Sequence, residues 1–129
     1  MDTPWFTAEE IAHLLANARR WYGTEEAGAE DDPPFDPEPV ALLHLPGTRC
    51  RWLVFGIDGE SGDADDPILV ILADLGLGCV EYGTVFAREL AEGAFGRPVV
   101  RDPTFRAQGP MSRYAAASMP RGRLVLDPE

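Results

Sequence analysis

The sequence predicts a single α+β domain in which a mainly antiparallel sheet carries an N-terminal amphipathic helix on one face. Two observations predict this class. Apolar residues recur at helical spacing over residues 8–22, and at least four later segments have the composition of strands. A chain of 129 residues, 45% of them hydrophobic, is long enough for one core, so we assign one domain, 1–129. A helix followed by several strands is typical of α+β proteins.

The first helix has signals at both ends. Thr7 can cap it, and Glu10, three residues on, completes a capping box. Gly23 suits a left-handed stop after Tyr22. The apolar stripe of the helix should pack on the strands, and we expect six residues in the core: Ile11, Leu14, Leu15, Leu53, Val70 and Leu72.

The remaining elements follow from apolar patterns separated by glycine and proline. Pro46 and Gly47 separate two strand-like arms and predict a hairpin. The nearly continuous apolar run at 68–74 indicates a strand buried on both faces. In order, we expect a hairpin of 40–45 and 48–58, a strand at 68–74, a glycine turn at 75–79, a strand at 81–87, a helical turn at 88–92, an edge strand at 99–101, a helix at 111–118, and a terminal strand or tail at 123–127.

Charge is distributed unevenly along the chain. Of the net charge of −11, residues 1–80 contribute −12 and residues 81–129 contribute +1. Two acidic loops are predicted, at 24–39 with seven carboxylates and at 58–67 with five, and neither contains a base. Phe35 can pin the middle of the first loop to the body of the protein. The negative electrostatic field of the two acidic loops repels phosphates and attracts cationic surfaces, so we expect no direct nucleic-acid binding.

The arginines of the second half have two interpretations. Six of them, with Phe105 and Tyr114 among them, could form a modest patch for single strands. We favour internal pairing with the N-terminal acids. The six are Arg97, Arg101, Arg106, Arg113, Arg121 and Arg123.

Catalytic and ligand motifs are weak in this sequence. Gly76 and Gly78 follow an apolar strand, but Glu81 stands where a dinucleotide fingerprint needs its third glycine. We expect instead a tight turn in which both glycines have positive φ and Asp74 accepts hydrogen bonds from turn amides. No calcium loop fits residues 58–66. Cys79 could be a nucleophile assisted by His44 or His13, although a buried or inert thiol is favoured.

Several segments together resemble a known bacterial family, the domain of unknown function 2958. The most specific are the Asp-Leu-Gly-Leu-Gly turn at 74–78 and the downstream Arg101-Asp102 pair, and the resemblance runs over nearly the whole chain. Members of that family often occur on plasmids and integrating elements, beside conjugation and antirestriction genes. The resemblance therefore implies a mobile-element setting, but no activity, cofactor or catalytic residue.

From these observations we expect a non-enzymatic acidic protein-interaction module. In a mobile-element setting it would be an anti-defence inhibitor, an anti-CRISPR or antirestriction protein that acts as a nucleic-acid decoy on the basic surface of a host defence complex. We expect eleven partner-binding carboxylates: Glu25, Glu26, Glu30, Asp31, Asp32, Asp36, Asp58, Glu60, Asp63, Asp65 and Asp66.

Two alternatives stay open, a small cytoplasmic enzyme with a site centred on Cys79, and an accessory protein of a plasmid or integrative element without inhibitor activity. We assign no catalytic residue, cofactor or metal site. The acidic opening does not have the pattern of a signal peptide, and the longest apolar stretch, 68–73, is far too short for a bilayer. We therefore expect a cytoplasmic protein with reduced thiols and no membrane contact.

Overall fold

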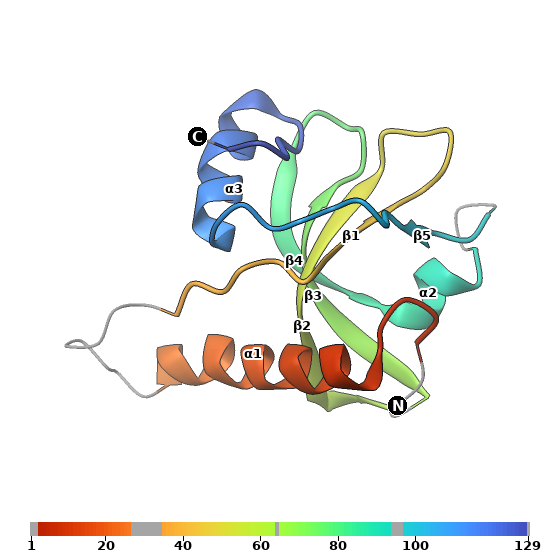
Figure 1. Ribbon diagram of the computed structural model, residues 1–129, viewed down its shortest axis with the longest axis vertical. Coiled ribbons are helices and arrows are strands. Elements are labelled where there is room, and N and C mark those ends of the chain that lie inside the picture. Colours follow the sequence, from red (N-terminus) through yellow and green to blue (C-terminus); the bar gives the residue numbers. More distant parts are fainter. Residues whose placement is uncertain (1–2, 27–34, 64, 94–96, 129) are drawn as a thin grey trace.

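The computed structural model in Figure 1 describes residues 3–26, 35–63, 65–93 and 97–128. It confirms the α+β class, with one long helix ahead of a five-stranded sheet. Short helices follow the sheet strands in the second half of the chain. The elements are α1 (Ala8–Glu26), β1 (Ala41–His44), β2 (Arg51–Asp63), β3 (Asp66–Asp74), β4 (Val80–Phe86), α2 (Ala87–Ala91), β5 (Val100–Arg101), α3 (Met111–Ser118) and a 3₁₀ turn, η1 (Met119–Arg121).

The sheet has the strand order β4-β3-β2-β1-β5, and each neighbouring pair is antiparallel. The predicted hairpin is confirmed: β1 and β2 pair around the turn that contains Gly47, whose φ is +80°. β5 joins the other side of β1, far from it in sequence, with Leu43 opposite Arg101. The two outermost strands are therefore β4 and β5, and they differ in length by five residues.

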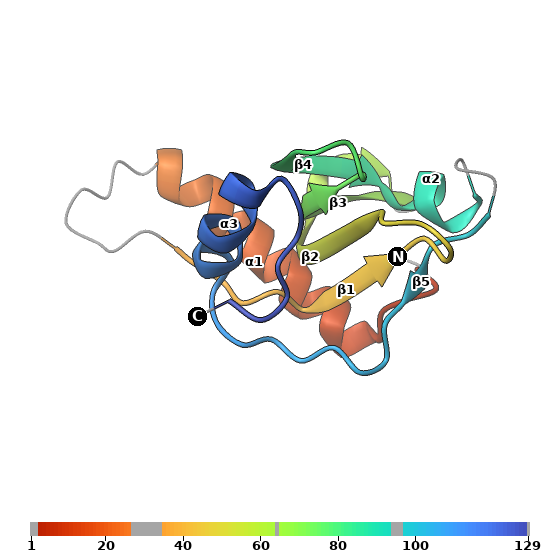
Figure 2. The ribbon, with the colours of Figure 1, turned by 90° about the horizontal axis from the view of Figure 1, so that it is seen from above.

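Alternate residues of the strands build a hydrophobic cluster on each face of the sheet. Leu43, Trp52 and Ile71 belong to the first cluster, which the N-terminal residues Trp5 and Phe6 and helix α2 cover. The second cluster is covered by α3 and the segment after it. Its buried members are Ala18, Leu42, Leu53, Phe55, Val70, Leu72, Val80, Met111, Tyr114, Ala115 and Leu124. Figures 1 and 2 show that α2 and α3 lie on opposite sides of the molecule.

Helix α1 packs across β2 at a bulge. The β2–β3 register shifts between Val54 and Gly56, and a β-carbon at Gly56 would come within 3.3 Å of Ala18 Cβ. Beside it, the buried Asn17 side chain donates a hydrogen bond to the Phe55 carbonyl (2.9 Å). Small residues and a satisfied amide thus let the helix approach the bent strand closely.

The predicted core is confirmed in four of its six positions. Leu14, Leu53, Val70 and Leu72 are buried, whereas Ile11 and Leu15 are only partly buried and pack against the first cluster.

Two predicted segments differ from the structure, and a third, predicted as a strand or a tail, takes the second of these forms. Helix α1 does not stop at Gly23 but continues to Glu26, because a single glycine costs a helix only about 1 kcal/mol and two good helix formers, Glu25 and Glu26, lie just beyond it. The segment predicted as a loop at 58–67 is largely strand: β2 continues to Asp63 and β3 begins at Asp66. No strand forms at 123–127, where Leu124 and Val125 are nevertheless buried.

Among the described residues, no helix combines the length and the apolar character of a membrane span.

Candidate interaction surface

The eleven carboxylates that the sequence proposes for partner binding are not gathered in one place. Glu30, Asp31 and Asp32 lie outside the described residues. Glu25 and Glu26 end α1, and only their backbone is described. The other six belong to the segment before β1 or to the outer part of the β2–β3 hairpin, residues 58–67, which we call the acidic arm: Asp36 in the former, and Asp58, Glu60, Asp63, Asp65 and Asp66 in the latter.

Asp36 is bonded to the start of α3. Its Oδ1 accepts a hydrogen bond from the Ser112 backbone N–H (3.0 Å), and its Oδ2 accepts one from the Ser112 hydroxyl. The preceding amide, at Met111, donates to the Pro37 carbonyl (2.7 Å). Since α3 has no side-chain cap of its own, Asp36 satisfies a free helical donor from 76 residues away. Phe35 lies beside it, and the guanidinium carbon of Arg20 is 4.2 Å from the centre of the Phe35 ring. This contact with α1 agrees with the predicted anchoring role of Phe35.

On the acidic arm, Asp58 stabilises the local chain. Its Oδ1 accepts hydrogen bonds from the backbone N–H groups of Glu60 (3.0 Å) and Ser61 (3.2 Å). This arrangement bends the strand where its register with β3 shifts. The Glu60 side chain remains exposed and borders a hollow of about 170 Å³ between α1 and β2, opposite Arg19.

The end of the acidic arm is tied to α2. Asp66 Oδ1 accepts a hydrogen bond from the Arg88 backbone N–H (2.9 Å), which caps the first turn of α2. The Arg88 side chain donates to the Asp65 carbonyl (3.4 Å) and pairs with Glu92 (3.5 Å). The arm and the helix therefore form one surface, although 22 residues separate the capping pair.

Four carboxylates of the acidic arm and α2 lie around two hollows on this surface. Two hollows, of about 460 and 290 Å³, share Arg88 and Glu92 in their walls. Phe86, which is 49% exposed, lines the larger one. We call the carboxylates of these hollows the acidic face: Asp65, Asp66, Glu89 and Glu92. The sequence prediction missed Glu89 and Glu92, because only pairing between arm and helix shows that they lie beside the arm.

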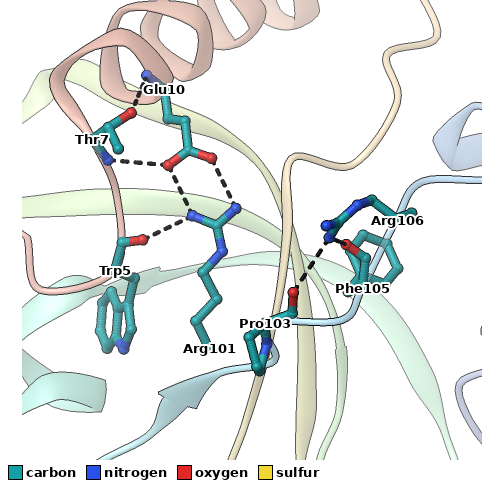
Figure 3. Close-up of polar contacts among 7 residues, drawn as sticks. All are labelled: Trp5, Thr7, Glu10, Arg101, Pro103, Phe105 and Arg106. Carbon is teal, nitrogen blue, oxygen red and sulfur yellow. Dashed lines mark hydrogen bonds and ion pairs between the residues drawn. The ribbon is translucent and has the colours of Figure 1, made fainter.

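Glu10 and Arg101 form a bidentate ion pair (Figure 3). The guanidinium donates two parallel hydrogen bonds of 2.8 Å to the carboxylate and a third, of 2.9 Å, to the Trp5 carbonyl. Thr7 completes the predicted capping box, with bonds of 3.0 and 3.1 Å to Glu10. These hydrogen bonds, those from Arg101 above all, lower the pKa of Glu10 from 4.5 to about 2.

The preference for internal arginine–acid pairing is confirmed for Arg101 alone of the six arginines, within the described part of the chain. Arg97 donates instead to the Pro46 carbonyl (3.0 Å), and Arg106 donates to the carbonyls of Phe105 and Pro103 (2.8 and 3.3 Å; Figure 3). Tyr114, proposed as an aromatic member of a single-strand patch, is fully buried. That patch therefore lacks one of its two stacking rings.

The glycine turn at 75–79 has the predicted conformation. Gly76 and Gly78 have φ values of +76° and +89°, and Asp74 accepts a hydrogen bond from the Gly76 N–H (2.8 Å). The second oxygen of the buried Asp74 accepts a bond from Leu124 N–H (2.9 Å). A β-carbon at Gly122 would come within 2.4 Å of the Gly78 carbonyl oxygen. The turn is thus fastened to the C-terminal segment by a carboxylate and by close backbone contact.

Cys79 is exposed, so of the two predicted states the buried thiol is excluded, and the inert thiol stays a prediction. Its proposed partners are not beside it: His13 is exposed on α1, and His44 lies on β1, which β2 and β3 separate from β4. Cys50 is a second free thiol, directed at the Leu75 carbonyl (3.4 Å). Within the described ranges, no group of three or more histidine, cysteine or acidic residues could hold a metal ion.

Comparison with known families places the chain in one of them. The family described as protein of unknown function (DUF2958) matches residues 5–125. The chain therefore belongs to this family, as its Asp74–Gly78 turn and Arg101-Asp102 pair indicate. No curated protein and no solved structure matches it.

Proposed function

We propose that this chain is an acidic protein-interaction module that binds a basic surface of another protein. The observation that carries the proposal is the acidic face, where four carboxylates surround a single guanidinium and an exposed phenylalanine. The field of the whole chain, −11, adds to this local excess and accelerates association with a cationic partner. An apolar side chain within a charged rim is the usual composition of a protein contact.

The finer form of the proposal concerns the class of partner. A surface that binds nucleic acid presents arginine and lysine to phosphates, and carboxylates at similar positions compete with those phosphates. We propose that the chain acts as such a decoy, on an anti-defence target such as a CRISPR effector or a restriction enzyme. The mobile-element setting that the family resemblance implies supports this choice of target.

Affinity capture with matched charge variants tests the proposal. Asp65→Asn with Glu89→Gln removes two exposed acids of the acidic face and spares Asp66, which caps α2. Glu38→Gln with Asp127→Asn removes the same charge elsewhere, at exposed positions. Each protein is immobilised and exposed to a bacterial lysate at low and high salt, with and without double-stranded DNA as competitor.

The proposal expects a partner that the wild type and the control pair retain at low salt. The acidic-face variant should retain less of this partner, and high salt or competing DNA should release it from the wild type. Salt screens the carboxylates, and DNA phosphates compete with them for the same basic surface. A partner that the acidic-face pair retains as well as the wild type, regardless of salt, would contradict the proposal. A partner that DNA fails to displace would contradict the decoy class alone.

A further inference from the structure

Strand β4 forms an open edge of the sheet. It pairs with β3 on one side, and no strand in the described part of the chain pairs with its other side. The side chains of Glu81, Tyr82, Thr84 and Phe86 are exposed, and a β-carbon built at Gly83 would meet no atom within 4 Å. Figure 2 shows β4 at the margin of the sheet, next to β3.

Glu81 is the one charged residue on this strand, which otherwise lacks the features that usually protect exposed edges. Natural edges are short, bulged, or carry lysine or proline. β4 is seven residues long, contains neither residue type, and keeps an unbroken register with β3 from Val80 to Phe86. Its outward N–H and C=O groups are therefore regularly spaced, as a pairing strand requires.

The surroundings of the edge are acidic. Near its start lie Glu81, on the strand itself, and Asp36, whose charge helps to raise the pKa of Tyr82 after the larger effect of burial. At its other end Phe86 lies in the hollow of the acidic face, with Asp66, Glu89 and Glu92 around Arg88. Glu81 and Asp36 thus lie toward one end of β4, and Asp66, Glu89 and Glu92 lie with the Arg88 guanidinium toward the other.

We propose that β4 binds an extended, arginine- or lysine-bearing segment of a partner protein, which adds to the sheet as a sixth strand. Main-chain hydrogen bonds to β4 supply the binding, and the carboxylates at both ends select basic side chains. A second copy of this chain is the weaker occupant, because each copy has a charge of −11. The proposal rests on the proposed function and adds the site and the conformation of the bound segment.

A blocked peptide of alternating arginine and valine, as long as β4, is the first probe. Its binding to the ¹⁵N-labelled full chain should shift the amide signals of residues 81–86 and slow their hydrogen exchange. Two further peptides carry backbone N-methyl groups on all arginines or on all valines. Alternate N–H groups of a strand face opposite edges, so only the arginine set or the valine set can donate to β4. The peptide that is methylated on the donating set should bind roughly tenfold more weakly than the other. A glutamate–valine peptide should not bind.

Substitutions in β4 are the second probe. Successive amides of a strand point to opposite sides, so one of Gly83→Pro and Thr84→Pro removes an outward N–H and leaves the β3 ladder intact. The proline variant that keeps the wild-type melting temperature should bind the arginine–valine peptide roughly tenfold more weakly than its matched control, Gly83→Ala or Thr84→Ala. The N-methyl peptides decide the question with the wild-type chain even if both proline variants are unstable.

Three results would overturn the inference and leave the proposed function standing. The two N-methyl peptides could bind equally, the shifts could be confined to the acidic face, or the arginine peptide could fail to bind although the acidic face retains a lysate partner. Sedimentation that shows a dimer which Gly83→Pro or Thr84→Pro dissociates would assign the edge to a second copy instead. Equal binding of the glutamate–valine peptide would refute the basic chemistry of the segment.

Discussion

The two edges of the sheet have opposite designs. At the β5 edge, a strand of only two residues is held by the N-terminal segment: the Trp5 indole donates to the Val99 carbonyl (3.0 Å), and Arg101 is held by Glu10 and the Trp5 carbonyl. At the β4 edge, seven residues in regular register remain open. The same sheet therefore has one edge held by residues 91 to 96 positions away and one edge with which no described strand pairs.

This difference separates residues that stabilise the fold from residues that are free to contact a partner. The carboxylates of Glu10 and Asp74 accept hydrogen bonds from distant parts of the chain and so stabilise the fold. The exposed side chains of Asp65 and Glu89 make no such bond among the described contacts. If the separation is real, substitutions at the closed edge should change stability, and substitutions at the open edge should change binding alone.

The largest effect should come from Trp5→Ala. Trp5 is 8% exposed, packs in the first cluster and donates to Val99, so its loss should lower the free energy of unfolding by about 3–5 kcal/mol. The matched change at the open edge, Phe86→Ala, should cost less than about 1 kcal/mol, because Phe86 is 49% exposed. Urea denaturation of both variants measures the contrast, and similar losses would refute it.

Arg101→Ala should have the next largest effect. It leaves Glu10 without its bidentate partner and the Trp5 carbonyl without a donor, in a site where both charged side chains are about 30% exposed (31% and 27%). We expect a loss of about 1–3 kcal/mol in the same assay. Arg101→Lys is the informative control, because lysine keeps the charge but cannot form the parallel pair of bonds. If the Arg101→Lys variant kept the full stability of the wild type, the fork geometry would have no role.

Acid should weaken the closed edge through Glu10. Its pKa is about 2 in the folded chain and near 4.5 when unfolded, so its contribution to stability is present above pH 4.5 and is lost as the pH falls towards 2. Glu10→Gln removes this contribution, so the stabilities of wild type and variant should converge below pH 4.5. Chemical denaturation at pH values of about 6, 4, 3 and 2 follows the convergence. A difference that stays constant over this range would contradict the assignment.

The smallest effect should come from Thr84→Val at the open edge. Thr84 is exposed, so its substitution should change the free energy of unfolding by no more than about 0.5 kcal/mol. A loss above about 1.5 kcal/mol, by the same urea assay, would show that the β4 edge makes structural contacts and would remove the contrast with β5.

The sequence predicts elements whose signals are local. The capping box of Thr7 and Glu10, the positive φ of Gly76 and Gly78, and the alternation along β2 all follow from spacing within a few residues. The helix end at Gly23 was predicted wrongly, because the cost of a single glycine, about 1 kcal/mol, does not end a helix that good helix formers continue.

Contacts between distant segments account for the rest. A run of acids indicates a loop, yet β3 supplies the strand partner that extends β2 to Asp63. Likewise, nothing in the spacing links Asp36 to α3, Asp66 to α2 or Glu10 to Arg101, since these pairs are 22 to 91 residues apart. The eleven partner-binding carboxylates remain a prediction, and the structure adds Glu89 and Glu92 to the surface on which they can be tested.

The contact between Trp5 and Val99 also constrains the order of events during synthesis. The chain leaves the ribosome from its N-terminus, so Trp5 emerges 94 residues before the carbonyl that accepts its hydrogen bond. The β1–β4 hairpins can pair as they emerge, but until Val99 and Arg101 follow, the nascent sheet has two free edges and an uncovered tryptophan. We expect the nascent chain to be most prone to aggregation during this interval. A chain that ends before Val99 would have no closed edge.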